Sequence, residues 1–211
     1  RGARRTSRTA ASASDRPSRR RCPQGWLAQV VLPDHWVACG PFVREVFVES
    51  RVVVPTAPSM HALGRRLAAV LRPGDLVLAC GELGAGKTAL TQGIGAGLDV
   101  EGAVISPTFV LSRVHRSRVG GPTLVHVDAY RLADLAEVED LDLEASLAES
   151  VTVVEWGEGK AEQLADDRLD IVIQRSSDPE DDTRTVTLTG IGPRWAGVDL
   201  GIDTTPEDCD E

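Results

Sequence analysis

Residues 81–88 read GELGAGKT and match the pattern G-x-x-x-x-G-K-[ST], which is typical of loops that bind the phosphate groups of nucleotides. Backbone N–H groups curl around the phosphates in such a loop, and its glycines permit the backbone angles that this path requires. The Lys87 ammonium group suits the β- and γ-phosphates, and the Thr88 hydroxyl suits a Mg²⁺ ion. We therefore expect nucleotide contacts from the whole loop, namely Gly81, Glu82, Leu83, Gly84, Ala85, Gly86, Lys87 and Thr88.

The chain on either side of this loop has the pattern that a phosphate-binding loop requires, a buried strand before it and a helix after it. Residues 75–80 form a short apolar run behind the turn signal Pro73-Gly74. After the loop, Leu90, Ile94 and Leu98 recur on one helical face, although three glycines within residues 93–97 are expected to weaken that helix. The context favours a nucleotide site over a chance match.

Two carboxylates each stand at the end of an apolar run that predicts a buried strand. Residues 123–128 end in Asp128, and residues 151–155 end in Glu155. In an open parallel sheet the ligand crevice lies at the carboxyl ends of the strands, so both acids are expected to face the nucleotide. At least one of them would hold Mg²⁺ or its water molecules during phosphoryl transfer. The alternative for each acid is a helix cap or a surface position.

Three further sites leave a functional and a structural interpretation open. The segment 106–108 could report the γ-phosphate through a hydroxyl group, or it could be an ordinary strand bulge. His126 could be a general base or a hydrogen-bonded core residue. Arg131 could neutralise phosphate charge, or it could pair with the acidic segment 134–149, which is expected to be helical in part.

The remaining periodicity predicts the order of the elements. An opening strand at 46–54 precedes a helix at 56–71, and residues 104–111 have a strand-like pattern that Pro107 interrupts. Alternating apolar and polar residues at 169–173 and 185–189 predict an antiparallel pair. We expect an α/β fold with a mainly parallel sheet, flanked by helices, and this antiparallel strand pair near its C-terminal end.

These elements fall within residues 46–192, which we expect to form the ordered domain. Residues 1–45 are expected to be a disordered or non-native extension, and their first half is rich in arginine and serine. A basic arm for nucleic acid is the alternative for that arginine-rich part. Residues 193–211 turn acidic and are expected to be a disordered tail.

Composition argues against several classes of protein. The chain has 211 residues and is 42% hydrophobic, enough for a core, but no apolar run approaches the ~20 residues of a membrane helix. The formal net charge of -9 argues against broad binding of DNA or RNA by the whole surface. The 4 cysteines include no C-x-x-C pair, which disfavours zinc and a disulfide framework and fits a reduced, cytoplasmic setting.

Four motifs in this order resemble the TsaE (YjeE) family: GELGAGKT, SPTF at 106–109, HVDAYRL at 126–132 and VEWGE at 154–158. Members of that family are small bacterial ATPases required for threonylcarbamoyladenosine synthesis on tRNA. The similarity covers about residues 46–190 and implies a P-loop NTPase-type fold with a site for ATP and Mg²⁺.

The resemblance also assigns roles to particular residues. It implies that Thr88 and Glu155 bind the metal and that Asp128 is a catalytic acid, with Lys87 and Thr108 as further catalytic residues. Glu158 and Arg184 match positions at which the family contacts nucleotide.

A protein partner follows from the same resemblance. Proteins of the TsaE family act with the TsaB–TsaD pair, in which TsaD transfers the threonylcarbamoyl group to adenosine 37 of certain tRNAs. ATP hydrolysis would reset that complex and allow multiple turnover. The tRNA would then be reached only through the partner complex.

Two rival functions share the same loop. A small-molecule P-loop kinase would need an acceptor pocket and usually a mobile lid with arginines, and no Arg-rich insertion lies between Thr88 and Thr189. A nucleotide-gated interaction module without useful turnover would have the same sequence pattern, so product release must decide. A GTPase is disfavoured because the chain has no N-K-x-D motif for reading the base.

Overall fold

The computed structural model describes residues 46–132, 144–178 and 180–200, and the expectations for residues 1–45 and 201–211 lie outside this part of the chain. The elements follow in the order β1 (Val46–Val54), α1 (Ala57–Ala68), β2 (Leu76–Gly81), α2 (Lys87–Gly97), β3 (Ser112–His115), β4 (Thr123–Asp128), the 3₁₀ turn η1 (Ala129–Arg131), α4 (Glu144–Leu147), β5 (Ser150–Glu155), β6 (Arg168–Arg175), β7 (Arg184–Ile191) and the 3₁₀ turn η2 (Pro193–Trp195).

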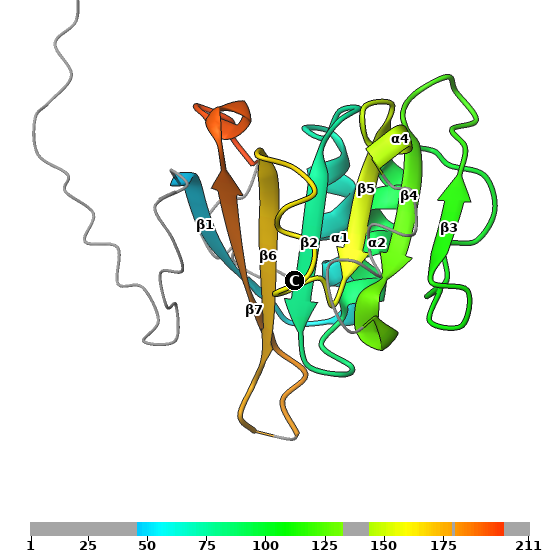
Figure 1. Ribbon diagram of the computed structural model, residues 1–211. Helices are drawn as coiled ribbons and strands as arrows, with labels where there is room; N and C mark the ends of the chain where they lie inside the picture. Colours follow the sequence, from blue (N-terminus) through cyan, green and yellow to red (C-terminus); the bar gives the residue numbers. More distant parts are fainter. Residues whose placement is uncertain (1–45, 133–143, 179, 201–211) are drawn as a thin grey trace, which may run out of the picture. The chain divides into compact units, whose positions relative to one another are not determined.

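One sheet of 7 strands runs through the described domain in the order β1-β7-β6-β2-β5-β4-β3 (Figure 1). The central strands β6, β2, β5 and β4 are parallel, whereas β1, β7 and β3 run antiparallel to their neighbours. The predicted α/β sheet with a mainly parallel centre is confirmed, and so is the antiparallel pair β6–β7. Because β2 lies in the middle, the loop that follows it emerges at the centre of the carboxyl edge.

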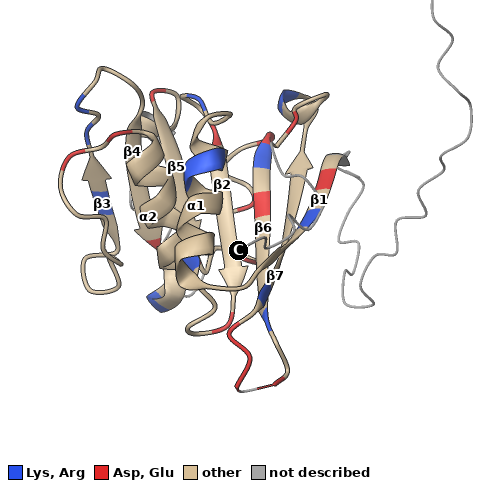
Figure 2. Ribbon diagram, turned by 180° about the vertical axis from the view of Figure 1, so that it is seen from behind, with Lys and Arg blue, Asp and Glu red and all other residues tan. Residues whose placement is uncertain are grey.

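The two long helices α1 and α2 lie on the same face of the sheet (Figure 2). They share a buried core with the sheet residues that point to that face, including Val77, Val153 and Ile171. Short segments cover the opposite face, where η1, α4 and the chain after β5 pack against Leu78 and Val127. No helix within the described ranges is long and apolar enough to cross a bilayer.

Helix α1 has the start signal and the apolar face that its sequence predicts. The Thr56 side chain caps it by accepting a hydrogen bond from the backbone N–H of Ser59 at 3.2 Å. The residues at helical spacing, Met60, Leu63 and Leu67, are all buried against the sheet and α2. The helix ends at Ala68, shortly before the predicted end at 71.

The glycines of α2 allow it to pack closely against α1. A β-carbon on Gly93 would collide with the carbonyl oxygen of His61, and a β-carbon on Gly64 would collide with that of Leu90. Helix α2 therefore forms despite its low intrinsic propensity, because close packing against α1 supplies the stability that the glycines cost.

Gly93→Ala should destabilise the protein, although alanine favours an isolated helix over glycine. We expect overpacking to lower the free energy of unfolding by about 1–3 kcal/mol. Ala96 is exposed on the same helix, and Ala96→Gly should cost roughly 1 kcal/mol through propensity alone. Denaturant unfolding of both variants measures this, and a Gly93→Ala protein more stable than wild type would contradict the close packing.

The strand-like interpretation of residues 104–111 is wrong. The Pro107 carbonyl accepts hydrogen bonds from the N–H groups of Val110 at 2.8 Å and Leu111 at 2.7 Å, which closes a turn. The position beside β4 is instead occupied by β3, which begins at Ser112. Pro107 lacks an N–H group to donate to a ladder, so the turn replaces a strand here.

The packed core continues beyond the expected boundary at residue 192. Trp195 is fully buried and Leu200 is 2% exposed, and both belong to the core under α1 and α2. The Arg194 guanidinium donates to both carboxylate oxygens of Asp75 at 2.8 Å and to Val70 O at 2.8 Å. These bonds tie the segment after β7 to the connection between α1 and β2.

Candidate nucleotide and metal site

The phosphate-binding loop joins the end of the central strand β2 to the start of α2. Gly86 caps α2 with a φ of 113°, a left-handed conformation that favours glycine. Helix α2 begins at Lys87, so its first backbone N–H groups have no intrahelical partners and carry the positive end of the helix dipole. This is an arrangement that binds phosphate groups.

The Lys87 side chain is held inside the site. Its Nζ donates to Gly81 O at 2.7 Å and to Glu82 O at 2.9 Å, and it lies 3.6 Å from the centre of the Trp156 ring. Burial lowers the pKa of Lys87, while the nearby Glu155 and Asp128 carboxylates oppose that shift. The ammonium group is therefore already at the loop, bound to carbonyl oxygens whose place phosphate oxygens would take.

Trp156 reaches Lys87 because the backbone bends sharply at the end of β5. The φ of Trp156 is 62°, which is unusual for a residue other than glycine. The Trp156 N–H donates to Ala79 O at 3.2 Å. The Trp156 and Tyr130 rings also pack against each other, with centres 5.2 Å apart. Strained backbone of this kind clusters at functional sites.

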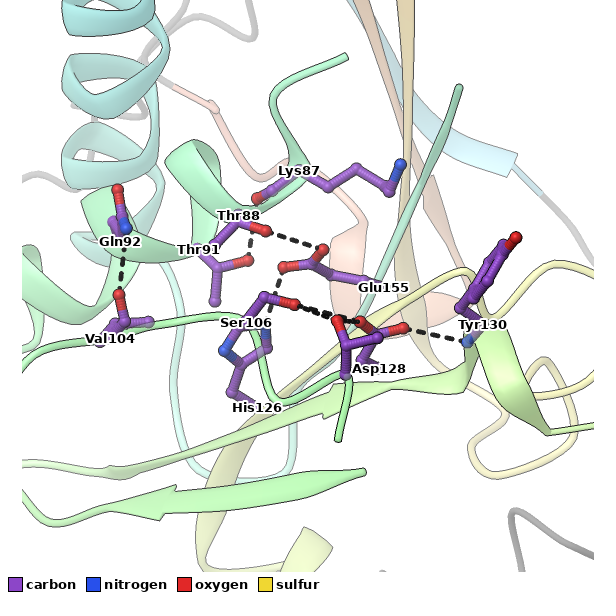
Figure 3. A network of polar contacts seen from close by, with 11 residues as sticks. Lys87, Thr88, Thr91, Gln92, Val104, Ser106, His126, Asp128, Tyr130 and Glu155 are labelled. Atoms are coloured by element: carbon purple, nitrogen blue, oxygen red, sulfur yellow. Dashed lines mark hydrogen bonds and ion pairs between the residues drawn. The ribbon is translucent and has the colours of Figure 1, made fainter. Parts of the chain in front are cut away.

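The structure brings Asp128 and Glu155 together at the carboxyl edge of the sheet. They are paired across β4 and β5, and they are only 3% and 2% exposed. Glu155 Oε2 accepts a hydrogen bond from the Thr88 hydroxyl at 3.0 Å, as Figure 3 shows. The ends of two strands and the start of α2 therefore place both acids directly beside the phosphate-binding loop.

The pair Thr88 and Glu155 fits a Mg²⁺ ion. This ion is usually bound by one or two side-chain oxygens together with water and the phosphate oxygens of a nucleotide. A hydroxyl and a carboxylate within hydrogen-bond distance of each other, next to the start of α2, supply such oxygens at the edge of the phosphate site.

Asp128 is held by the turn that replaces the expected strand. Its Oδ2 accepts hydrogen bonds from Ser106 Oγ at 3.1 Å and from Thr108 Oγ1 at 2.5 Å. Its Oδ1 accepts from the Tyr130 N–H at 3.0 Å. The hydroxyls of this segment thus donate hydrogen bonds that hold a carboxylate of the site in place. The interpretation as a strand bulge does not apply.

His126 lies beneath Glu155 and has no exposed surface. Its Nε2 is 2.7 Å from Glu155 Oε1, and the dashed line in Figure 3 marks this contact. A buried imidazole bound to a carboxylate of its own protein cannot reach a substrate. The structure therefore favours the core interpretation of His126 over that of a general base.

A pocket of about 600 Å³ opens beside the phosphate-binding loop. Glu158, which the resemblance assigns to nucleotide binding, is exposed on its wall. Burial raises the pKa of Cys80 to about 12, so that thiol stays neutral and is a poor nucleophile. The full lining consists of Cys80, Gly81, Glu82, Tyr130, Trp156, Glu158 and Lys160.

Arg184 and Arg175 are paired across β7 and β6, and the role of Arg184 in nucleotide binding stays a prediction. Arg184 begins β7 and forms an ion pair with Asp182 at 3.5 Å. Its cross-strand partner Arg175 has Nη1 3.9 Å from the position that a β-carbon would take on Gly84. No motif in the sequence marks Arg175, which comes close to the loop because β6 lies beside β2.

Arg131 packs against Phe109, and most of the acidic segment 134–149 lies outside the described residues. Its guanidinium carbon lies 4.9 Å from the centre of the Phe109 ring. Phe109 itself is 84% exposed, and Leu83 in the loop and Tyr130 are also largely exposed. Large exposed side chains thus occur in the phosphate-binding loop, on the pocket wall and next to the turn that holds Asp128.

Comparison with known proteins places these features in one family. The family model for the threonylcarbamoyl adenosine biosynthesis protein TsaE matches residues 54–186. The tRNA threonylcarbamoyladenosine biosynthesis protein TsaE of Streptomyces coelicolor is 61% identical over 145 residues, which cover 68% of this chain and 98% of that protein. The protein of the same name from Bacillus subtilis is 40% identical over 135 residues, covering 64% of this chain and 81% of that protein.

The fold comparison agrees. The crystal structure of Bacillus subtilis YdiB matches with a TM-score of 0.57 and 32% identity, and the match covers 72% of this chain and 90% of that one. This likeness supports the predicted P-loop NTPase-type fold. The chain belongs to the TsaE family of threonylcarbamoyl adenosine biosynthesis proteins.

Proposed function

We propose that this member of the TsaE family is a Mg²⁺-dependent ATPase that acts on a TsaB–TsaD transferase complex. Each round of ATP hydrolysis would reset that complex, so that it can modify adenosine 37 of further tRNA molecules in the cytoplasm. The observation that carries the proposal is the contact between the Thr88 hydroxyl, in the first turn of α2, and Glu155 Oε2 at 3.0 Å. Glu155 is paired with Asp128 across β5 and β4.

The residues of the site would have separate roles in ATP hydrolysis. The first N–H groups of α2 and Lys87 would bind the phosphates, while Thr88 and Glu155 would hold the metal. A bound Mg²⁺ would neutralise charge on the β- and γ-phosphate oxygens. Asp128, fixed by Ser106 and Thr108, would orient the attacking water molecule and accept its proton at a carboxylate oxygen.

The surface around the site supports the partner part of the proposal. Leu83 in the phosphate-binding loop is 83% exposed, and Phe109 next to Thr108 is 84% exposed; a partner protein at the site would cover such apolar side chains. The net charge of -9 favours reaching tRNA through a partner rather than directly. The loop between β6 and β7 is acidic (red in Figure 2) and adds negative charge to the surface at the ends of these strands.

The pocket beside the loop supports one alternative, a small-molecule P-loop kinase. Its lining combines the aromatic pair Tyr130 and Trp156 with the charged groups of Glu158 and Lys160. A pocket of this kind could hold an acceptor for the γ-phosphate. The fate of that phosphate separates the two functions, because an ATPase releases it and a kinase transfers it.

The test is the rate of phosphate release from ATP by the purified protein, alone and with a TsaB–TsaD complex and tRNA. We expect slow release alone and a clear rise with the complex, since a group supplied by a partner can contribute about 10³–10⁵ in rate to phosphoryl transfer. Lys87→Ala protein mixed with the same complex is the control for contaminating ATPases. An unchanged rate of release would contradict the proposed action on the transferase.

A further inference from the structure

We propose that His126 is a positioning residue for the metal site: it fixes the Glu155 carboxylate so that the other carboxylate oxygen faces Thr88. The inference rests on the proposed role of Thr88 and Glu155 in binding Mg²⁺. It assigns a function to a histidine that touches neither nucleotide nor solvent.

The contacts of Glu155 carry the argument. Its Oε1 is bound by His126 Nε2 at 2.7 Å, and its Oε2 accepts from the Thr88 hydroxyl at 3.0 Å (Figure 3). Each carboxylate oxygen thus has its own partner, and the two partners come from different elements, β4 and α2. A carboxylate bound at both oxygens has little freedom to rotate, so the loss of either partner would release it.

The register of the sheet explains why only position 126 can make this contact from β4. Asp128 is paired with Glu155 and His126 with Val153, so the two residues of β4 project from the same face as Glu155. Asp128 is engaged by the hydroxyls of Ser106 and Thr108. His126 lies two residues before Asp128 on the same face of β4, and its ring contacts the Glu155 carboxylate.

The environment of His126 indicates that its contact with Glu155 is the reason for a polar residue at this position. Among the described residues its Nδ1 has no hydrogen-bond partner, and the side chain is fully buried in the sheet. A carboxylate oxygen only accepts hydrogen bonds, so Nε2 must carry the shared proton. One ring nitrogen is left unsatisfied so that the other can hold Glu155.

Two variants separate positioning from simple packing. His126→Phe keeps a ring and removes the donor, whereas His126→Gln keeps an N–H donor of similar reach. The measurement is the affinity for Mn²⁺ in the presence of ADP, together with the affinity for ADP without metal. We expect His126→Phe to weaken Mn²⁺ binding about 10–100-fold, as loss of a partner of a metal ligand usually does. His126→Gln should recover most of it, and metal-free ADP binding should not change.

His115 provides a matched control. It is also a buried histidine, its Nδ1 lies 3.3 Å from Glu101 O, and its Nε2 has no partner among the described residues. It lies on β3, and within the part of the chain that the structure describes its hydrogen-bond partner is Glu101, which is not a residue of the proposed metal site. His115→Phe should leave both affinities unchanged, so that a general effect of removing a buried imidazole can be recognised.

A measurement on the wild-type protein keeps the inference testable even where a variant does not fold. In spectra of ¹⁵N-labelled histidine, His126 should carry a proton on Nε2, whether or not metal and ADP are bound. An unprotonated Nε2 would overturn the inference, and so would unchanged Mn²⁺ affinity in folded His126→Phe protein. None of these readouts requires ATP hydrolysis, so they stand apart from a failure of the proposed ATPase function.

Discussion

Replacing Lys87 with alanine should abolish ATP hydrolysis and weaken ATP binding by a factor of ~10 to ~10², because hydrogen bonds to charged groups contribute about 1.5–3 kcal/mol. The ammonium group is bound to two loop carbonyls and lies over Trp156, so its removal takes a positive charge from the phosphate site itself. Calorimetric titration with ATP and with ADP, next to a phosphate-release assay, measures both effects.

The fold should survive this substitution, because Lys87 makes polar contacts with the loop and is not part of either apolar core. Arg66→Ala is the matched control: Arg66 is an exposed cation in the last turn of α1, so its loss removes one charge without touching the loop. Near-normal ATP affinity in a folded Lys87→Ala protein would contradict the assignment of residues 81–88 to phosphate binding.

Asp128→Asn should depress ATP turnover by about 10²–10⁴, the usual contribution of a positioned acid or base, while ATP affinity changes little. Asparagine has nearly the same shape: its oxygen can still accept from the Tyr130 N–H, and its NH2 can donate to the hydroxyls of Ser106 and Thr108, so the turn should keep its place. What is lost is the carboxylate that would accept a proton from water. Single-turnover hydrolysis measured beside ATP binding separates these two quantities.

Glu155→Gln gives the contrasting result if the two acids have different roles. The loss of a metal-binding carboxylate should weaken Mg²⁺-dependent nucleotide binding in the ground state, in contrast to the turnover effect expected for Asp128. Titration of Mg²⁺ and ATP against both variants tests the distinction. Equal losses of affinity would show that both acids act on the metal.

The main features of the fold were predictable because they depend on local patterns. The apolar run before Gly81 and the spacing of Leu90, Ile94 and Leu98 after the loop identify the strand and the helix. Two apolar runs that end in Asp128 and Glu155 predict strands whose carboxyl ends lie at one edge of a parallel sheet, and the structure pairs them as β4 and β5. The proximity of the two acids follows from that geometry.

Other features depend on contacts between distant parts of the chain. The glycines of α2 look unfavourable in the sequence, but Gly93 lies against α1 in the structure. The chain turns at 107–111, and β3 rather than this segment takes the place beside β4. Trp195 lies in a segment that becomes acidic overall, and its burial depends on the space left by the sheet and α1.

The side-chain contacts of the site were the least predictable part. Nothing in the spacing of residues indicates that Lys87 stacks on Trp156 or that Arg175 comes close to Gly84. The bond between His126 and Glu155 joins residues 29 positions apart and depends on the register of two strands. Such contacts require the strand order, which local periodicity does not determine.

If ATP hydrolysis by this protein drives repeated tRNA modification, the yield of modified tRNA must depend on Asp128. The most direct test counts modified tRNA molecules per TsaD in a complete reaction with wild-type protein and with Asp128→Asn protein. We expect many modifications per TsaD with wild-type protein and no more than a single round with the variant. The same multiple-turnover yield with both proteins would contradict this role of ATP hydrolysis.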